Sequence, residues 1–403
     1  MKYFLALKRM QNFHLWVLAF FYLPQSIIGF YVYDQNYALL FLAIAFVSLF
    51  SYLFFFYIVF GGGYFHRFFH RFWKSSFDVA NYPFVVFGAY FLLIVYAIIT
   101  TDQIALFMAF KGASIDELAR SREMFLRTRE GWEAIFPYVN ALFVMAFLPY
   151  TIASLFYRRN KLRFYFLIPF LFCLALTLEK SVAILAVVPI IILAVNSGKS
   201  NKSFRIIVFL AIFIAGVSFL SRGGGQDNMS TVPETGGAAS IPEAYQLFKC
   251  DSQLCYILNR VTWIPYATAI DWLRYQNIVL RGDYVLGKSI GVFSTFLDVP
   301  KVNLERDVFE FQWGQNETGT GSSNTVYFID AFVNFSWFGV LLYAAVLALI
   351  VKILVLSDNV PIKCASFVSL FYLGVNSLPP MIFSGGLVVL IPIALFSRQR
   401  IKI

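Results

Sequence analysis

Long apolar runs dominate the chain, and its polar residues are concentrated in the connections between these runs. A run of about 17–25 apolar residues crosses a bilayer as a helix. Ten runs approach or reach this length, at residues 13–33, 37–60, 82–100, 135–156, 164–178, 181–195, 206–220, 326–351, 362–378 and 381–397. The pattern predicts an all-α, polytopic membrane protein with about ten transmembrane helices. The first run is too long for a cleavable signal, so we expect it to remain as an anchor.

Two polar segments divide these runs. Residues 101–136 form a medium loop and residues 221–325 a large one. We therefore expect three regions. Residues 1–220 hold helices one to seven with a charged helix in the medium loop, residues 221–325 form the large loop, and residues 326–403 hold helices eight to ten.

The distribution of Lys and Arg predicts the orientation. With the N-terminus in the cytoplasm, the cytoplasmic segments hold 18 of the 32 Lys and Arg residues but two of the 22 acidic residues. Short cytoplasmic loops of membrane proteins are enriched in basic residues. We expect both termini to be cytoplasmic and the two polar loops to lie outside. The net charge of +10 is therefore a topology signal, and it does not indicate nucleic-acid binding.

The four cysteines fall into two pairs. Cys173 and Cys364 lie in apolar runs, where a thiol packs as a small hydrophobic group. Cys250 and Cys255 lie close together in the large loop, and their spacing differs from the usual zinc and thioredoxin motifs. We expect a local disulfide in an oxidising compartment, with two free thiols as the alternative.

The sequence of the medium loop predicts a charged helix that begins with a capping box formed by Ser114 and Glu117 and ends at Gly131. Its arginines are candidate phosphate ligands, because a guanidinium donates two parallel hydrogen bonds to an anion. The candidates here are Arg120, Arg127 and Arg129. The alternative is a solvated helix laced with internal ion pairs. Lys180, beside Glu179 in a turn between two short runs, either neutralises a lipid-linked phosphate or pairs with its neighbour.

A second group of arginines lies in the large loop, interleaved with carboxylates and aromatic residues. It comprises Arg260, Arg274 and Arg281. Arginines hold phosphates, carboxylates accept hydrogen bonds from sugar hydroxyls, and aromatic faces stack on sugar rings. The alternative is an amphipathic helix on the membrane surface with an aromatic belt. We expect these arginines, Lys180 and the medium-loop arginines to supply a diphosphate-binding cluster.

Several kinds of site are excluded by what the polar segments lack. Neither a nucleotide-binding phosphate loop nor a glycine-rich dinucleotide fingerprint occurs. The three histidines, His14, His66 and His70, lie on the cytoplasmic side or in the first run. A histidine base or histidine-ligated metal on the outside face is therefore excluded, and we expect no metal and no cofactor.

The layout and two local patterns resemble the Wzy-type O-antigen and oligosaccharide repeat-unit polymerases. The segment from Asn324 to Gly339 is similar to the stretch with which that family re-enters the membrane, and Ser336 stands where the family often has Gly. Arg120 and Gly131 fit the spacing of an arginine and a glycine in one family loop. The matching longer-spaced motif in the large loop is absent.

The resemblance implies a GT-C-like polymerase architecture in the bacterial inner membrane and a metal-independent glycosyltransferase. Such an enzyme moves a growing glycan from undecaprenyl diphosphate onto the next lipid-linked repeat unit, and a chain-length-determining co-polymerase is a further expected partner. The expected partners thus comprise the lipid-linked oligosaccharide and membrane lipid, but no nucleic acid. The departing diphosphate needs a cation, and the acceptor hydroxyl needs a base. The candidate bases are Asp271, Asp283, Glu305 and Asp307.

Two alternatives remain open. An O-antigen ligase has a similar layout but relies on a histidine in its large loop, which is lacking here. A transporter or flippase for lipid-linked sugars should have charged or broken helices near the membrane midplane, whereas these runs hold few charges.

Overall fold

The computed structural model describes residues 9–63, 65, 67, 82–101, 103–126, 129–178, 188–194, 208–209, 212–213, 216, 253–296, 298–314 and 321–396. Throughout these residues the secondary structure is helical, and strands are absent. Five helices are long and apolar enough to cross a membrane: Met10–Val32, Gln35–Val59, Tyr82–Ile99, Gly131–Tyr157 and Tyr327–Leu356. Three shorter apolar helices are Arg163–Leu176, Val360–Tyr372 and Leu387–Phe396. The prediction of an all-α, membrane-embedded protein is confirmed, whereas the number of ten spans is not tested.

The chain begins with a helical hairpin. Its first limb comprises η2 (Arg9–Asn12), α2 (Phe13–Val17), η3 (Leu18–Tyr22) and α3 (Leu23–Val32), and its second comprises α4 (Gln35–Leu53) and η4 (Phe54–Val59). Asp34 stands in the turn and caps α4, because its carboxylate accepts hydrogen bonds from the N–H groups of Asn36 and Tyr37 at 3.1 and 3.3 Å. An aspartate at this position satisfies N–H groups that have no partner inside the helix.

A second set of helices follows in the chain. It contains α6 (Tyr82–Ile99), α7 (Ala105–Phe110), α8 (Ile115–Leu126), η5 (Gly131–Ile135), α9 (Phe136–Leu142), η6 (Phe143–Phe147), α10 (Leu148–Tyr157) and α11 (Arg163–Leu176). The capping box of α8 is present, with reciprocal hydrogen bonds between Ser114 and Glu117 at 2.8 and 3.3 Å. The described helix ends at Leu126 rather than at Gly131, which instead begins η5 with a φ of 60°.

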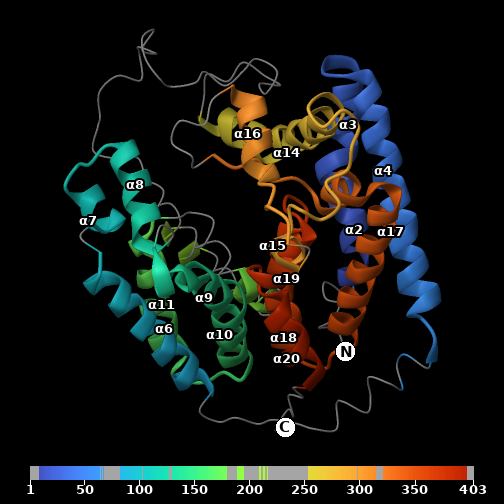
Figure 1. Ribbon diagram of the computed structural model, residues 1–403. Coiled ribbons are helices and arrows are strands. Elements are labelled where there is room, and N and C mark those ends of the chain that lie inside the picture. The colour runs from blue at the N-terminus through green and yellow to red at the C-terminus, as the bar shows by residue number, and fades with distance from the viewer. Residues whose placement is uncertain are drawn as a thin grey trace.

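The third set is α14 (Gln253–Ile278), α15 (Gly291–Phe296), α16 (Leu304–Trp313), α17 (Tyr327–Leu356), α18 (Val360–Tyr372), α19 (Leu378–Phe383) and α20 (Leu387–Phe396). One continuous helix, α14, runs through Pro265. It lies at the end of the molecule where α3 and α4 meet, next to α16 (Figure 1). Gly29 allows α3 and α14 to come close, because a Cβ there would lie 2.4 Å from the Tyr266 ring.

These helices form two hydrophobic cores. One core joins α2, α3 and α4 to the helices from α14 onward, and the other is built from α6 to α11. Figure 1 shows the two groups side by side, with α10 beside α18. The Asn359 amide donates a hydrogen bond of 3.0 Å to the Tyr150 hydroxyl across this junction.

The apolar stretch of α17 is not one straight helix. Phe335 and Ser336 have non-helical dihedral angles, with φ 58° and ψ −153° at Ser336. A Cβ on Gly339 would lie 2.2 Å from the carbonyl oxygen of Ala331, although positions eight residues apart in a straight helix are about 12 Å apart. The first arm (residues 327–334) and the second arm (residues 337–356) therefore fold back on each other as a hairpin. The second arm alone has the length of a membrane span.

Three of the long apolar helices contain a π-helical turn. These turns are η3, η4 and η6, at Leu18–Tyr22, Phe54–Val59 and Phe143–Phe147. A π-helical turn inserts one residue into an α-helix. Because η3 and η6 have α-helical residues on both sides, helical side chains before and after these two turns follow different stripes, whereas η4 ends its helix at Val59.

Candidate functional site

A polar cluster joins α14 to the turn of the first hairpin. The Arg274 guanidinium binds the Asp34 carboxylate at 3.0 Å and lies 3.5 Å from Asp271 Oδ1. It also lies over the Tyr33 ring, with Cζ 4.6 Å from the ring centroid. The Tyr33 hydroxyl donates a 2.8 Å hydrogen bond to Asp271. Two of the predicted residues, Arg274 and Asp271, thus meet in one network with Asp34.

Asp271 is the most enclosed of the four candidate bases. It is 2% exposed, and its second carboxylate oxygen accepts a 3.0 Å hydrogen bond from the Gln312 amide of α16. The Ser323 hydroxyl donates in turn to the Gln312 side-chain oxygen, and Ser323 accepts a 2.9 Å hydrogen bond from the Trp272 indole. These contacts tie α14, α16 and the approach to α17 together.

The two carboxylates bound to Arg274 differ in pKa. Burial raises the pKa of Asp271, although the hydrogen bonds from Gln312 and Tyr33 and the nearby Arg274 oppose this. Partial burial would also raise the pKa of Asp34, but the hydrogen bonds from Arg274 and from the α4 N-terminus outweigh it and lower that pKa. An arginine between two carboxylates leaves this cluster with a net negative charge. Through these contacts Arg274 joins α14 to the turn of the first hairpin, and its role in diphosphate binding stays a prediction.

Glu305 has a different environment. It stands in the first turn of α16 and accepts a 3.1 Å hydrogen bond from the Ser322 hydroxyl. Its main-chain oxygen accepts a 2.9 Å hydrogen bond from the N–H of Ser323. Burial raises the pKa of Glu305, and Ser322 and the charge of Lys301 oppose this rise. Glu305 is therefore a partly buried carboxylate with a cation nearby.

One exposed cation, Lys301, lies close to this carboxylate. The main-chain oxygen of Lys288 accepts a 3.1 Å hydrogen bond from the N–H of Val302, the residue after Lys301. The backbone thus brings Lys288 next to the segment that carries Lys301, and both residues are exposed. A carboxylate with a raised pKa and a neighbouring ammonium group can accept a proton while a phosphate is held close by.

A second acidic residue lies inside the α17 hairpin. Asp330 in the first arm is 3% exposed and accepts a 3.0 Å hydrogen bond from the Asn334 amide. The Asn334 side-chain oxygen accepts a 2.7 Å hydrogen bond from the Ser289 hydroxyl. Glu305 is close enough to Asp330 to interact with it electrostatically. The Glu305 region and the hairpin are therefore adjacent.

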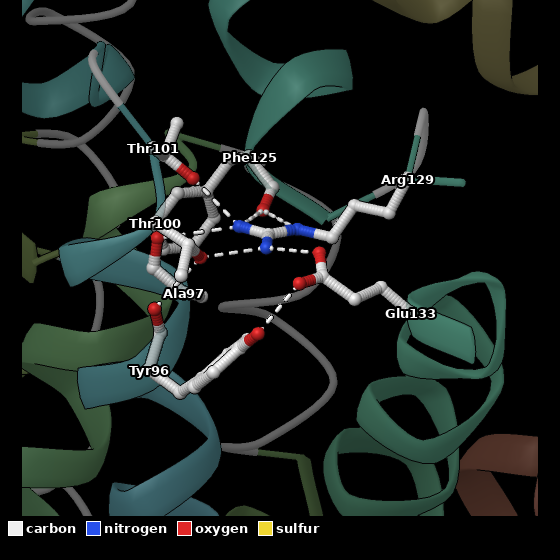
Figure 2. A network of polar contacts seen from close by, with 7 residues as sticks. All are labelled: Tyr96, Ala97, Thr100, Thr101, Phe125, Arg129 and Glu133. Atoms are coloured by element: carbon white, nitrogen blue, oxygen red, sulfur yellow. Dashed lines mark hydrogen bonds and ion pairs between the residues drawn. The ribbon is translucent and has the colours of Figure 1, made fainter. Parts of the chain in front are cut away.

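Arg129 occupies a separate network in the second core (Figure 2). Its side chain is 6% exposed and forms an ion pair of 2.7 Å with Glu133. All five guanidinium N–H groups have acceptors within the protein, at 2.6–3.3 Å, in Phe125, Thr100, Glu133, Ala97 and Thr101. Ala97 and Phe125 are in the last turns of α6 and α8, so Arg129 caps two helix ends. A phosphate would have to displace one of these acceptors.

The other predicted residues are dispersed. Arg120 is exposed on α8, Arg281 and Asp283 are exposed in the turn after α14, and Asp307 is half-buried on α16. Burial and the charge of Glu310 raise the pKa of Asp307. Arg127, Lys180 and Cys250 lie outside the described residues, as do the side chains of Arg260 and Cys255. The disulfide and the complete diphosphate cluster therefore remain predictions.

Three residues of these polar networks were not among the site residues predicted from the sequence: Asp34, Asp330 and Asn334. Asp34 could have been noticed as the acidic residue in a very short turn between two apolar runs. Asp330 and Asn334 were treated as part of an apolar span, although an acid inside such a run indicates a functional site. Within the described residues no group of three or more His, Cys, Asp or Glu side chains could hold a metal ion.

No protein-family model, curated protein or solved structure matches this chain.

Proposed function

We propose that the protein is a metal-independent glycosyltransferase that polymerises oligosaccharide repeat units carried on undecaprenyl diphosphate, at the outer face of the bacterial inner membrane. The observation that best supports this is the group around Glu305, because it combines a base, an adjacent cation and proximity to membrane helices. In this reaction the acceptor hydroxyl attacks the anomeric carbon of the donor sugar. A new glycosidic bond forms, the bond to the lipid diphosphate breaks, and the hydroxyl proton passes to a carboxylate.

Glu305 is the carboxylate that we assign to proton transfer. Asp271 is already engaged by Tyr33, Gln312 and Arg274, whereas Asp283 is exposed in the turn after α14. Lys301 and Lys288 are assigned to the departing diphosphate, with Arg281 in the turn after α14 as a further exposed cation. A charge-assisted hydrogen bond contributes about 1.5–3 kcal/mol, so the loss of one cation should slow polymerisation about tenfold or more.

Deletion of the gene in its native host tests the reaction class. A polymerase is supported if the surface glycan loses its ladder on a gel while one repeat unit stays attached to its acceptor. Polymer that remains on its lipid carrier and never reaches the acceptor would instead identify a ligase.

Variants of α16 test the assignment of Glu305. Glu305→Gln should abolish the ladder, and Lys301→Ala should shorten or weaken it. Glu310→Gln removes the same charge from an exposed position on the same helix and should leave the ladder intact. Equal ladders from Glu305→Gln and the wild type, at equal protein levels, would remove Glu305 from the mechanism.

A transporter for lipid-linked sugars is the second candidate function, and one observation favours it. Its expected signs, a broken helix and an internal charge, both occur in α17 at Ser336 and Asp330. Accumulation of lipid-linked repeat units on the cytoplasmic face of the deletion strain would favour this function over the polymerase.

A further inference from the structure

The Asp330 carboxylate is enclosed in an apolar part of the molecule without full compensation. One of its oxygens accepts the Asn334 amide at 3.0 Å, but Oδ2 is buried and forms no well-aligned hydrogen bond with the described residues. The Tyr343 hydroxyl, on the second arm, and the Ser377 hydroxyl lie close enough to interact with the carboxylate, but the buried Tyr343 hydroxyl likewise forms no well-aligned hydrogen bond there. Leaving such groups unpaired costs free energy that folded proteins usually avoid.

The groups that face Asp330 are oxygen-rich and carry no positive charge. They come from four elements: Asn334 of the first arm, Tyr343 of the second arm, Ser377 at the start of α19 and Glu305 of α16. His14 of α2 contacts the Tyr327 hydroxyl, one turn away on the first arm. The described neighbours of Asp330 thus add a second carboxylate and no ammonium or guanidinium group.

The end of the first arm makes this region still more negative. Asn334 is the last helical residue before the break, and the C-terminal end of a helix carries partial negative charge. The main-chain oxygens of Val333 and Asn334 accept hydrogen bonds of 3.2 and 2.8 Å from the N–H groups of Val285 and Leu286. Asp330 lies beside Tyr343, which is about 9 Å along the axis of the second arm from its first residue, Trp337. The carboxylate is therefore enclosed among the apolar helices.

We propose that Asp330, Tyr343, Asn334 and Ser377 form a binding site for a small monovalent cation inside the α17 hairpin. Carboxylate, hydroxyl and amide oxygens are the ligands of hard cations. One buried carboxylate at the site matches a single positive charge, whereas a divalent ion usually takes several carboxylates. The bound cation would neutralise Asp330 and hold the two arms together. This proposal is independent of the reaction that the protein performs.

Thermal unfolding of the purified full-length protein in detergent tests the site with sodium ion as the probe. Samples at pH 8 contain equal concentrations of sodium, potassium or N-methyl-D-glucamine chloride. The melting temperature of the wild type should rise by several degrees in sodium, and the rise should saturate with concentration, because a ligand that binds the folded state stabilises it. Glu310→Gln, which removes an exposed charge, should keep this response.

Asp330→Asn makes the test decisive. The amide removes the uncompensated charge at almost constant shape, so this variant should melt above the wild type in N-methyl-D-glucamine and should not respond to sodium. A variant that melts below the wild type in every salt would mean that the protein itself compensates Asp330, and the proposal would be wrong. Equal wild-type melting temperatures in all three salts would also overturn it, including the case in which only a lower pH stabilises the protein and a proton occupies the site.

Discussion

At the residue scale, arginines in similar sequence contexts have different structural environments. Arg120 and Arg129 belong to the same charged segment, yet one is exposed on α8 and the other is buried with every N–H group bound. An arginine that caps two helix ends stabilises the fold. The effect of a substitution should therefore depend on the environment of each arginine.

Arg129→Ala should destabilise the protein by about 2–3 kcal/mol, because it leaves Glu133 and several helix-end oxygens without their donor. Arg129→Lys should recover little of this loss. A compact ammonium group cannot reach all the acceptors that the planar guanidinium of arginine binds at once. Thermal unfolding in detergent measures both effects. Arg120→Ala, on the same segment, serves as the control with a near-zero effect. An equal loss for the two alanine variants would contradict the structural role of Arg129.

Asp34→Asn removes the ion pair with Arg274 but keeps the cap of α4, because asparagine is also a good N-cap residue. The variant therefore measures the contribution of the ion pair alone. The pair is partly exposed, so we expect a loss of about 1 kcal/mol at pH 7. The pKa of Asp34 is lowered in the folded protein from an ordinary value of 3.8. Its stabilisation is thus present above about pH 4 and is lost as the pH falls through the folded-state value. Wild type and variant should therefore converge in melting curves recorded from pH 7 to pH 3.

The contribution of Asp271 to the pH dependence of stability has the opposite sign to that of Asp34. Its pKa is raised by burial, so its ionisation opposes folding above the folded-state pKa and this penalty disappears as the pH falls. In the wild type the pH-dependent stability contributions of Asp34 and Asp271 partly cancel. The melting temperature of Asp34→Asn must therefore be compared with that of the wild type at the same pH. A difference between Asp34→Asn and the wild type that persists unchanged at pH 3 would exclude the ion pair as its cause.

At the element scale, hydropathy predicted helices well and their breaks poorly. The capping box at Ser114 and Glu117 was correct because its signal is local. The reversal at Ser336 could not be derived from composition, since the run from Tyr327 to Leu356 is apolar on both sides of it. Only the packing of residue 339 against residue 331 fixes that turn. The same holds for the site: Arg274 and Asp271 were recognised as candidates, but their partner Asp34 lies 240 residues away in the chain.

Ser336→Gly should stabilise the hairpin. Its φ of 58° and ψ of −153° lie in a region that only glycine adopts easily, at a cost of about 1–3 kcal/mol for other residues. We expect the variant to melt higher than the wild type in detergent.

Gly339→Ala should act in the opposite direction. An added Cβ would lie 2.2 Å from the Ala331 oxygen, so the arms would have to separate. The melting temperature should fall by several degrees, whereas Gly88→Ala, with no atom within 4 Å of the added Cβ, should leave it nearly unchanged. A tolerated alanine at position 339 would argue against the close contact of the two arms.

At the scale of the whole molecule, the two cores place the candidate groups on different bodies of helices. Arg120 and Arg129 belong with α6 to α11, whereas Arg274, Glu305 and Asp330 belong with the first hairpin and α14 to α20. The distribution of basic residues puts the α16 region outside and the α10–α11 turn inside. This orientation is a prediction that labelling can test.

Single cysteines at Glu310 and Asn160, both exposed, should report opposite sides of the membrane. In a background with Cys250 and Cys255 replaced by serine, Glu310→Cys should react with a membrane-impermeant maleimide in intact cells. Asn160→Cys should react only after the membrane is opened. Cys173 and Cys364 are buried and should contribute little. Reversed labelling would place the Glu305 group in the cytoplasm and remove the basis for an enzyme that acts on the outer face.

The π-helical turns inside two apolar helices have a consequence for how this protein can be compared with its relatives. The turns η3 and η6 each correspond to one inserted residue, and deleting it would rotate the rest of the helix by about 100°. Relatives without the insertion would keep the same side chains in contact only if an alignment opened a one-residue gap inside a membrane helix. An alignment without such a gap would misalign every position from Tyr22 or from Phe147 to the end of its helix, and distant kinship would be hidden there.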